Sequence, residues 1–371
     1  MDSLPRETVD GETVRLREPR ESDAPLVIEA CADPKTQRFL PGLPNPYTAD
    51  DALWWINEAT EAAWEGGGAS YAIADPQTDE IVGSIALRLV VEGRQQGEMG
   101  YWVAPWARGR GIATDATATL TDWAFQHGYA RIELLTEHEN VFSQRVAMTT
   151  GYQREGVRRG AGVRADGARY DLVVFARLWD DPPGPIARLL PDLPGGELTD
   201  GTVTLRPLRT EDIDDVYALH CLPEVVASTV PPLAPDPAAV ALRCARAASR
   251  WLAGERVDLT IRDTASGEFA GEIGLYYQEP TTGQAMIGYD LVPKWRGRGY
   301  ATRAARLVAG WAFATTGIGR LIAGTAPANV ASQRVLERAG FTREAVQRGR
   351  LLAADGTRVD DLLYALVAPG S

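Results

Sequence analysis

Two short glycine–arginine segments are the clearest candidates for chemistry in this sequence of 371 residues. The first reads RGRGIAT from residue 108, and the second reads RGRGYAT from residue 296. Each follows a segment with strand character and precedes one with helical periodicity. Backbone N–H groups at a helix start point outward and the helix dipole favours anions, so such a turn can bind a phosphate group. Neither segment is the GxGxxG pattern of a dinucleotide site or a P-loop.

Both segments belong to a long internal repeat. Residues 99–125 match residues 287–313 with an offset of 188, and residues 140–152 match residues 329–341 with an offset of 189. A constant register over so many residues indicates two copies of one domain, each long enough for its own core. We predict an N-terminal domain over 1–180, a proline- and glycine-rich linker over 181–198, and a C-terminal domain over 199–371.

The order of elements within each copy predicts an α/β layer fold. Opening strands near residues 13–19 and 202–208 precede helical regions, for which Asp50 and Asp236 are candidate N-caps. Strands over 70–75, 80–90 and 97–105 lead into the first glycine segment. A helix then leads to a buried strand over 131–137, a second helix ending at Gly151, and a closing strand over 170–178.

The combined pattern resembles the GNAT superfamily of acyl-CoA-dependent N-acetyltransferases. The resemblance rests on Arg-Gly-x-Gly-x-Ala after a strand, followed some thirty residues later by Asn-x-x-Ser-x-x-Val and a closing Gly-Tyr or Gly-Phe. The opening VRLREPRESDA and the GYW strand are similar to the RimJ/RimL branch. The resemblance implies two tandem GNAT folds, each a mixed, mainly antiparallel central sheet flanked by helices. It also implies acetyl-CoA, or another acyl-CoA, as the cofactor.

The resemblance assigns expected roles to individual residues. Main-chain groups of Val103 and Leu291 face the pantetheine arm, Asn140 and Asn329 contact the cofactor, and Ser143 and Ser332 lie near the leaving sulfur. The residues expected to cradle the pyrophosphate are Arg108, Gly109, Arg110, Gly111, Ile112, Ala113 and Thr114 in the first copy, and Arg296, Gly297, Arg298, Gly299, Tyr300, Ala301 and Thr302 in the second.

The sequence departs from the family at the general acid. Many members carry a tyrosine in the second helix, where this chain has Ala147 and Leu336. Neither side chain can donate a proton, so Ser143 and Ser332, or a water that they hold, are the candidate acids. The alternative is that each serine only caps the helix or lines the groove.

Candidate general bases differ between the copies. Glu98 is the candidate in the first copy, where the second has Met286, and Asp290 or Glu272 is the candidate in the second. Each carboxylate can instead be an ordinary residue at a strand edge. Asp171 and Asp360 either receive an acceptor amine or cap a turn.

Aromatic and imidazole side chains give weaker signals. The three histidines share no ligand spacing and are expected to be packed or at the surface, and we predict no metal site. Trp123 and Trp311 pair across the repeat and are expected in the cores. The tryptophans of the first helical region either line an acceptor pocket or pack in the core; they are Trp54, Trp55 and Trp64.

Composition restricts the partners. The formal net charge of −12 disfavours nucleic acid and favours a cationic amine. Three cysteines without a CxxC pair and the lack of a signal peptide or membrane-length apolar run predict a cytoplasmic protein with no membrane association. A homodimer is possible.

Three functions agree with these features. The first is N-acetylation of a primary amine on a small cationic metabolite or antibiotic by direct attack. The second is RimJ/RimL-like acetylation of protein N-termini. The third is one catalytic domain fused to a non-catalytic acyl-CoA-binding domain.

Overall fold

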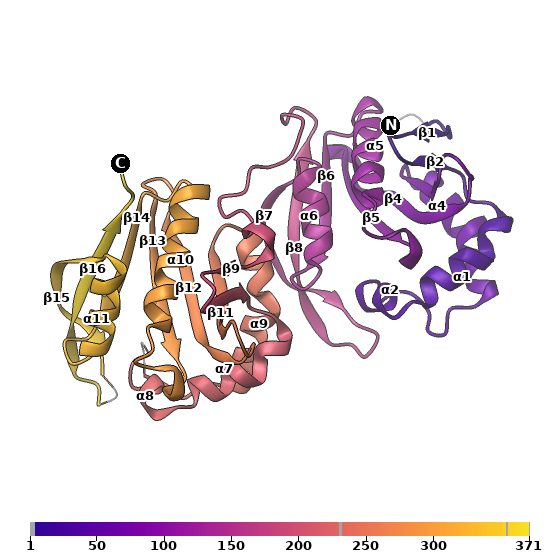
Figure 1. Ribbon diagram of the computed structural model, residues 1–371. Helices are drawn as coiled ribbons and strands as arrows, with labels where there is room; N and C mark the ends of the chain where they lie inside the picture. The colour runs from indigo at the N-terminus through magenta and orange to yellow at the C-terminus, as the bar shows by residue number, and fades with distance from the viewer. Residues whose placement is uncertain (1–3, 230–231, 354, 371) are drawn as a thin grey trace. The chain divides into compact units, whose positions relative to one another are not determined.

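The chain folds into two compact units, Met1–Ala187 and Arg188–Ser371. The computed structural model describes residues 4–229, 232–353 and 355–370 (Figure 1). Each unit contains one eight-stranded sheet with helices packed on it. In the described residues no helix is both long and apolar enough to cross a membrane.

The N-terminal unit has the strand order β1-β2-β3-β4-β5-β6-β8-β7. Among the described strands of this unit only the β5–β6 pair is parallel, so the sheet is mixed and mainly antiparallel, as predicted. The strands are β1 (Val9–Asp10), β2 (Arg15–Arg17), β3 (Ala69–Ala74), β4 (Ile81–Val91), β5 (Gln96–Val103), β6 (Arg131–Glu137), β7 (Gln153–Val163) and β8 (Arg169–Leu178). The helices are α1 (Ala24–Ala32), α2 (Pro34–Phe39), α3 (Ala49–Trp54), α4 (Thr60–Glu65), α5 (Ile112–Gln126) and α6 (Val141–Thr149).

The C-terminal unit repeats this arrangement. Its strand order is β15-β16-β14-β13-β12-β11-β10-β9, with β13–β14 as the parallel pair. The strands are β9 (Leu198–Thr199), β10 (Val203–Pro207), β11 (Arg256–Asp263), β12 (Phe269–Glu279), β13 (Gln284–Leu291), β14 (Arg320–Thr325), β15 (Thr342–Leu352) and β16 (Arg358–Val367). The helices are α7 (Ile213–His220), α8 (Pro223–Val226), α9 (Pro237–Leu252), α10 (Tyr300–Thr315) and α11 (Val330–Ala339).

Alternation along the strands separates the two faces of each sheet. In β3, Tyr71 contacts Trp123 of α5, with ring centroids 6.0 Å apart. Its neighbour Ala72 packs on the other face with Val27 of α1 and Ala52 of α3. Successive strand residues point to opposite faces, so α5 and the pair α1–α3 cover opposite sides of the sheet.

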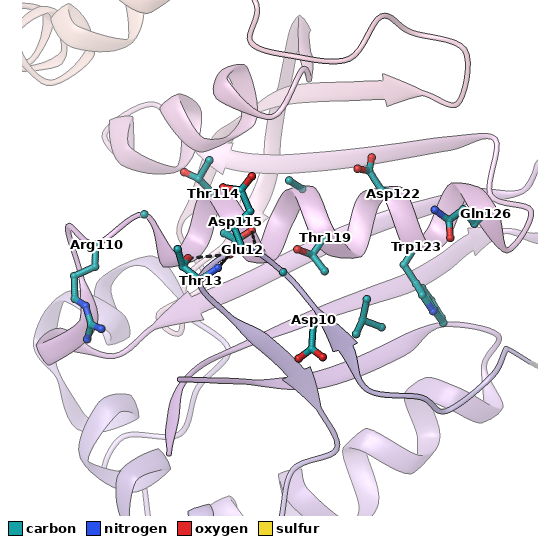
Figure 2. Close-up of a pocket in the computed structure, with 14 residues that line it drawn as sticks. Asp10, Glu12, Thr13, Arg110, Thr114, Asp115, Thr119, Asp122, Trp123 and Gln126 are labelled. Carbon is teal, nitrogen blue, oxygen red and sulfur yellow. Dashed lines mark hydrogen bonds between the residues drawn. The ribbon is translucent and has the colours of Figure 1, made fainter. Parts of the chain in front are cut away.

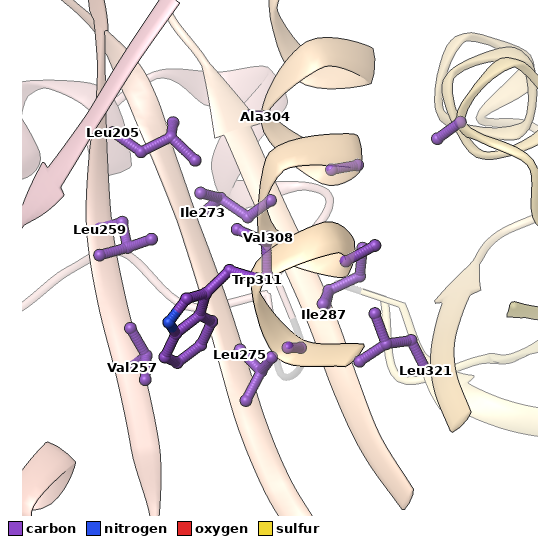
Figure 3. Packing of buried hydrophobic residues seen from close by; sticks show 14 of the residues in the cluster. Leu205, Val257, Leu259, Ile273, Leu275, Ile287, Ala304, Val308, Trp311 and Leu321 are labelled. Atoms are coloured by element: carbon purple, nitrogen blue, oxygen red, sulfur yellow. The ribbon is translucent and has the colours of Figure 1, made fainter. Parts of the chain in front are cut away.

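The C-terminal core lies between the sheet and α10. Val308 and Trp311 of α10 face Leu259, Ile273 and Ile287 of the sheet (Figure 3). Trp311 is 4% exposed and its repeat partner Trp123 is also 4% exposed, which confirms that both tryptophans belong to the cores. The helix carries apolar residues at helical spacing because one face must meet this sheet.

The residues before the second unit's first strand take part in its core. Leu190 and Leu193 are buried in the main C-terminal cluster. The Nε1 of Trp251 donates to the carbonyl oxygen of Leu190 at 3.1 Å. The apolar stretch around residue 190 is therefore packed against the second domain.

Helix capping agrees with the sequence at two predicted positions and differs at one. Asp236 caps α9 by accepting from Ala238 N at 3.1 Å, and Gly151 has the positive φ expected after α6. Asp50 is not a cap, and that prediction is wrong. Thr48 caps α3 in a reciprocal pair with Asp51, whose Oδ2 accepts from Thr48 N at 2.8 Å. Helix α3 continues into α4 through a π-helical turn over Trp55–Ala59.

Candidate active site

An opening between two parallel strands forms the centre of each candidate site. Pairing between β5 and β6 runs only from Gln96↔Arg131 to Met99↔Leu134. Ala104 N donates to Val82 O on the other side of β5. Both main-chain groups of a residue in an antiparallel strand point to the same side, so those of Tyr101 and Val103 face the opening.

The C-terminal domain has the same opening. Pairing between β13 and β14 ends at Met286↔Ile322, and Val292 N donates to Ala270 O. The main-chain groups of Tyr289 and Leu291 therefore face the opening. Val103 and Leu291, the two residues expected beside the pantetheine arm, thus direct main-chain groups toward the opening that no neighbouring strand pairs there.

The glycine–arginine segments form tight turns that end at a helix start. Gly109, Gly111, Gly297 and Gly299 have φ values of 77°, 80°, 74° and 83°. A Cβ at these positions would meet no atom within 4 Å, so the glycines are needed for their backbone conformation and not for space.

Free amides follow each turn. The first helical bond of α5 runs from Asp115 N to Gly111 O, and that of α10 from Arg303 N to Gly299 O. The amides of residues 112–114 and 300–302 therefore precede the helical hydrogen-bond ladder. Amides in this position can donate hydrogen bonds to an anion.

The first arginine of each segment stabilises the turn. Arg108 donates from Nε to Val103 O at 3.2 Å and from Nη2 to Asp33 Oδ2 at 2.7 Å. Arg296 donates from Nε to Leu291 O at 3.0 Å and pairs with Glu224 at 3.1 Å. These guanidinium groups connect the turn to the preceding strand and to α2 or α8.

A hollow of about 730 Å³ lies beside the first turn, between α5 and the β1–β2 connection (Figure 2). Arg110 lies at one end of it and Trp123 and Gln126 at the other. Asp115 accepts from the backbone N–H and the hydroxyl of Thr13, the latter at 2.8 Å. This carboxylate therefore fastens the β1–β2 connection to the first turn of α5.

The predicted serines lie at the start of the helix that follows the opening. Asn140 caps α6 by accepting from Ser143 N at 3.3 Å, and Asn329 caps α11 by accepting from Ser332 N at 3.1 Å. The Tyr101 hydroxyl donates to Ser143 Oγ at 3.0 Å. Sequence reasoning missed this tyrosine, although its signal, a Gly-Tyr pair in both central strands, is visible in the repeat.

Two predicted carboxylates face each other in the C-terminal domain. Glu272 on β12 and Asp290 on β13 are direct cross-strand partners. Glu272 accepts from Arg243 of α9 at 3.0 Å and lies 2.9 Å from Nε2 of His220 of α7. His220 is a packed histidine, one of the two expected environments, and the fold brings it to a carboxylate 52 positions away in the sequence.

The pKa values of these carboxyl groups move in opposite directions. Burial alone would raise the pKa of Glu272, but the hydrogen bond from His220 and the charge of Arg243 lower it to about 2. Burial and the charge of Glu272 raise the pKa of Asp290 to about 6. Within the described residues, the half-buried Asp290 carboxylate has no hydrogen bond or ion pair.

The matching face of the N-terminal domain is apolar. Ser84 and Trp102 occupy the same cross-strand register as Glu272 and Asp290. Trp102 packs against Trp55 with ring centroids 6.5 Å apart, in a cluster that contains the buried Cys31. Cys31 is the repeat partner of His220, at the offset of 189.

Glu98 lies near the N-terminal end of β5, in the part of the strand that is paired on both sides. It forms a cross-strand ion pair with the exposed Arg88 at 3.1 Å. The structure therefore does not bring Glu98 to the residues of the opening described above.

Helix α2 spans the opening of the N-terminal domain. Its N-cap Asp33 bonds Arg108 on the β5 side, while Arg38 pairs with Glu137 at the end of β6 at 2.8 Å. The Lys35 ammonium also lies 4.4 Å from the ring centroid of Phe142 on α6. The C-terminal counterparts of Arg38, Glu137 and Phe142 are alanines at positions 227, 326 and 331.

Two other predicted features have structural roles. Asp171 accepts from Gly160 N at 2.9 Å, and Asp360 accepts from Gly349 N at 2.8 Å, so each carboxylate bonds an irregularity in the strand pairing and not a turn. Trp64 is 7% exposed and packs on Tyr71 and Trp123 in the core, whereas Trp54 is exposed.

Comparisons with known proteins agree with this geometry. The acetyltransferase (GNAT) domain profile matches residues 13–153 and 202–342. An uncharacterized N-acetyltransferase, p20 of Bacillus licheniformis, is 27% identical over 175 residues, covering 46% of this chain and 96% of that protein. YdaF of Bacillus subtilis, a putative ribosomal N-acetyltransferase, is 26% identical over 174 residues, covering 45% and 90%.

Among solved structures, Mycobacterium smegmatis RimJ in complex with CoA-disulfide has a TM-score of 0.41 and 24% identity, covering 47% of this chain and 89% of that one. The two profile matches together span more than half of the sequence, one in each domain. The chain therefore belongs to the GNAT acetyltransferase family and is an acyl-CoA-dependent N-acyltransferase built from two such domains.

Proposed function

We propose that the C-terminal domain transfers an acetyl group from acetyl-CoA to the primary amine of a small cationic compound. The observation that carries this proposal is Asp290, a half-buried carboxylate beside the strand opening without a bonding partner among the described residues. A carboxyl group with a pKa of about 6 is ionised at neutral pH and can both attract an ammonium group and accept its proton. The deprotonated amine then attacks the thioester carbonyl directly.

Glu272 supports Asp290 without acting as the base. Its carboxylate is occupied by His220 and Arg243 and stays ionised across the working pH range. Its negative charge contributes to the raised pKa of Asp290. Of the two carboxylates predicted for this domain, we therefore assign proton acceptance to Asp290.

We propose that both domains bind acyl-CoA in the same way. The amides of 108–114 and 296–302 would hold the pyrophosphate, as their position before the helical ladder allows. The main-chain groups of Val103 and Leu291 would contact the pantetheine arm, with Asn140 and Asn329 beside it. Ser143 and Ser332 would then lie near the leaving sulfur.

The N-terminal domain differs on its acceptor side, and we propose that it binds acyl-CoA without acetylating the same amine. Trp102 replaces the acidic side chain, and Glu98 is paired with Arg88. Helix α2 is also fastened to both sides of the strand opening by Arg108 and Arg38. These features favour the alternative of one catalytic and one binding domain, with the domain division predicted above.

A thiol-release assay with acetyl-CoA and a panel of mono-, di- and polyamines tests the proposal. Asp290→Asn should lower kcat/KM by at least about a hundredfold, the usual contribution of a general base. Glu268→Gln, which removes an exposed carboxylate paired with Lys294, is the matched control and should retain full activity. An unchanged rate in Asp290→Asn, or a loss confined to Glu98→Gln, would contradict the assignment.

The name of the relative YdaF favours a second candidate, acetylation of protein N-termini. A peptide with a free N-terminus in the same assay distinguishes it: peptide turnover without turnover of any small amine would replace the first proposal. Calorimetric titration with CoA should give two equivalents per chain. One equivalent would contradict binding by both domains.

A further inference from the structure

A tyrosine–serine hydrogen bond spans the strand opening in both domains. The Tyr289 hydroxyl on β13 lies 2.9 Å from Ser332 Oγ in the first turn of α11. The corresponding distance from Tyr101 on β5 to Ser143 on α6 is 3.0 Å. The Tyr289 hydroxyl also lies 3.3 Å from the Ser332 carbonyl oxygen. The tyrosine–serine contact occurs in two domains whose acceptor faces differ, so it belongs to what the domains share.

The two serines are not engaged by their own helices. Thr121 and Thr315 show the usual alternative, since each donates to the carbonyl four residues earlier, at 2.6 and 2.7 Å. Ser143 and Ser332 lie in the first turn of their helices, where no helical carbonyl stands four residues earlier, so among the described residues neither hydroxyl bonds its own helix in this way. Their oxygen atoms instead meet a tyrosine hydroxyl that arrives from the central strand.

Neighbouring residues on β13 reach opposite faces of the sheet. Asp290 lies on the face of Glu272, His220 and Arg243, whereas the preceding Tyr289 reaches α11 on the other face. The opening lies between these two faces at the level of this residue pair. An acceptor amine approaching Asp290 and a sulfur leaving toward Ser332 would therefore lie on opposite sides of the reacting carbonyl.

We propose that Tyr289 is a positioning residue that donates its hydroxyl proton to Ser332 Oγ, so that the Ser332 O–H points to the leaving sulfur. Burial raises the pKa of Tyr289 to about 12, so its hydroxyl stays protonated and remains a donor at neutral pH. A serine oxygen that accepts from tyrosine directs its own hydrogen elsewhere. This inference rests on the proposed function of the C-terminal domain.

The step can be written with all charges accounted for. The C–N bond forms as the C–S bond breaks, and the electron pair of the C–S bond moves to sulfur. One proton of the attacking ammonium goes to Asp290 before attack, and the nitrogen gives a second proton to water once the C–N bond has formed. The Ser332 hydroxyl donates a hydrogen bond to the developing thiolate. The thiolate takes a proton from water after release, so neither Ser332 nor Tyr289 changes its protonation state.

Steady-state kinetics of Tyr289→Phe, Ser332→Ala and the double variant test this role, with the amine found in the thiol-release panel. Tyr289→Phe keeps the ring, and should lower kcat about tenfold with KM for both substrates within twofold, as expected for a bond that acts in the transition state. The double variant should be no slower than Ser332→Ala, because Tyr289 acts only through that serine.

Tyr364→Phe is the matched control. It removes another buried hydroxyl on the same sheet that reaches α11, at 3.4 Å from Glu337, and should keep kcat within twofold. A wild-type kcat in Tyr289→Phe, or losses that add to that of Ser332→Ala, would overturn the positioning role alone. A wild-type chain that releases no thiol with any amine would overturn the proposed function and this role with it.

Discussion

Replacing Asp290 with asparagine should stabilise the C-terminal domain at neutral pH. The pKa of Asp290 rises from an ordinary 3.8 to about 6 because the carboxylate is buried beside Glu272. Between these pH values the unfolded chain has lost the proton and the folded domain has kept it, so stability falls as pH rises. At about 1.4 kcal/mol per pKa unit, this rise lowers the free energy of unfolding by about 3 kcal/mol. The loss is complete above pH 6 and absent below about pH 4.

Hydrogen exchange of peptides from β12 and β13, followed by mass spectrometry, measures the opening free energy of this domain alone. Asparagine has no charge to bury. The opening free energy of Asp290→Asn should therefore exceed that of the wild type by about 3 kcal/mol at pH 8 and equal it near pH 4. The difference between the two proteins removes contributions from His220, Arg243 and Arg296, which face the same carboxylate.

The matching activity profile should rise with pH, with a midpoint in kcat/KM near 6 for the wild type. A variant that is no more stable at pH 8, or a stability difference that persists at pH 4, would refute the reasoning. Such a result would mean that Asp290 is paired or well solvated in the folded domain.

Three further substitutions test other parts of the two domains. Gly299→Ala, at a φ of 83°, should cost about 1–2 kcal/mol in the turn and weaken one of the two CoA equivalents in a calorimetric titration, whereas Gly310→Ala in the body of α10 should not. Arg243→Met leaves Glu272 and Asp258 buried without their shared cation, and should lower the unfolding free energy of the C-terminal domain by about 3–5 kcal/mol in urea. Arg38→Ala should speed amide exchange in α2 at least severalfold if this helix is held across the opening, and unchanged exchange would show that other contacts hold it.

The fold was predictable where apolar residues repeat with a clear period. The central strands, α5, α10 and the closing strands all bury one face, and their sequences show it. The strand β7 was not predicted, because it lies at the sheet edge with mostly exposed residues such as Arg158 and Arg159 and has no apolar alternation. Its counterpart β15 was missed for the same reason.

The candidate site was predictable only in its local parts. The turn glycines and the serine three residues after each asparagine are neighbours in sequence, so their spacing indicates their arrangement. The partner of Glu272 in α7 is 52 residues away, and the tyrosine bonded to Ser332 is 43 residues away. Such pairings depend on how the sheet brings its helices together, and no local pattern encodes them.

The acceptor faces of the two domains differ in several residues at once, and electrostatics explains why. The buried carboxylate of Glu272 is stabilised by the charge of Arg243 and by its hydrogen bond with His220, since an unpaired buried charge costs several kcal/mol. In the N-terminal domain Cys31 and Trp102 belong to an apolar cluster, and Ser84 is the cross-strand partner of Trp102. A buried acidic residue introduced at position 84 would therefore need a cation from a neighbouring element, as Glu272 has in Arg243. The turns and the tyrosine–serine pair involve no such buried charge and are the same in both domains.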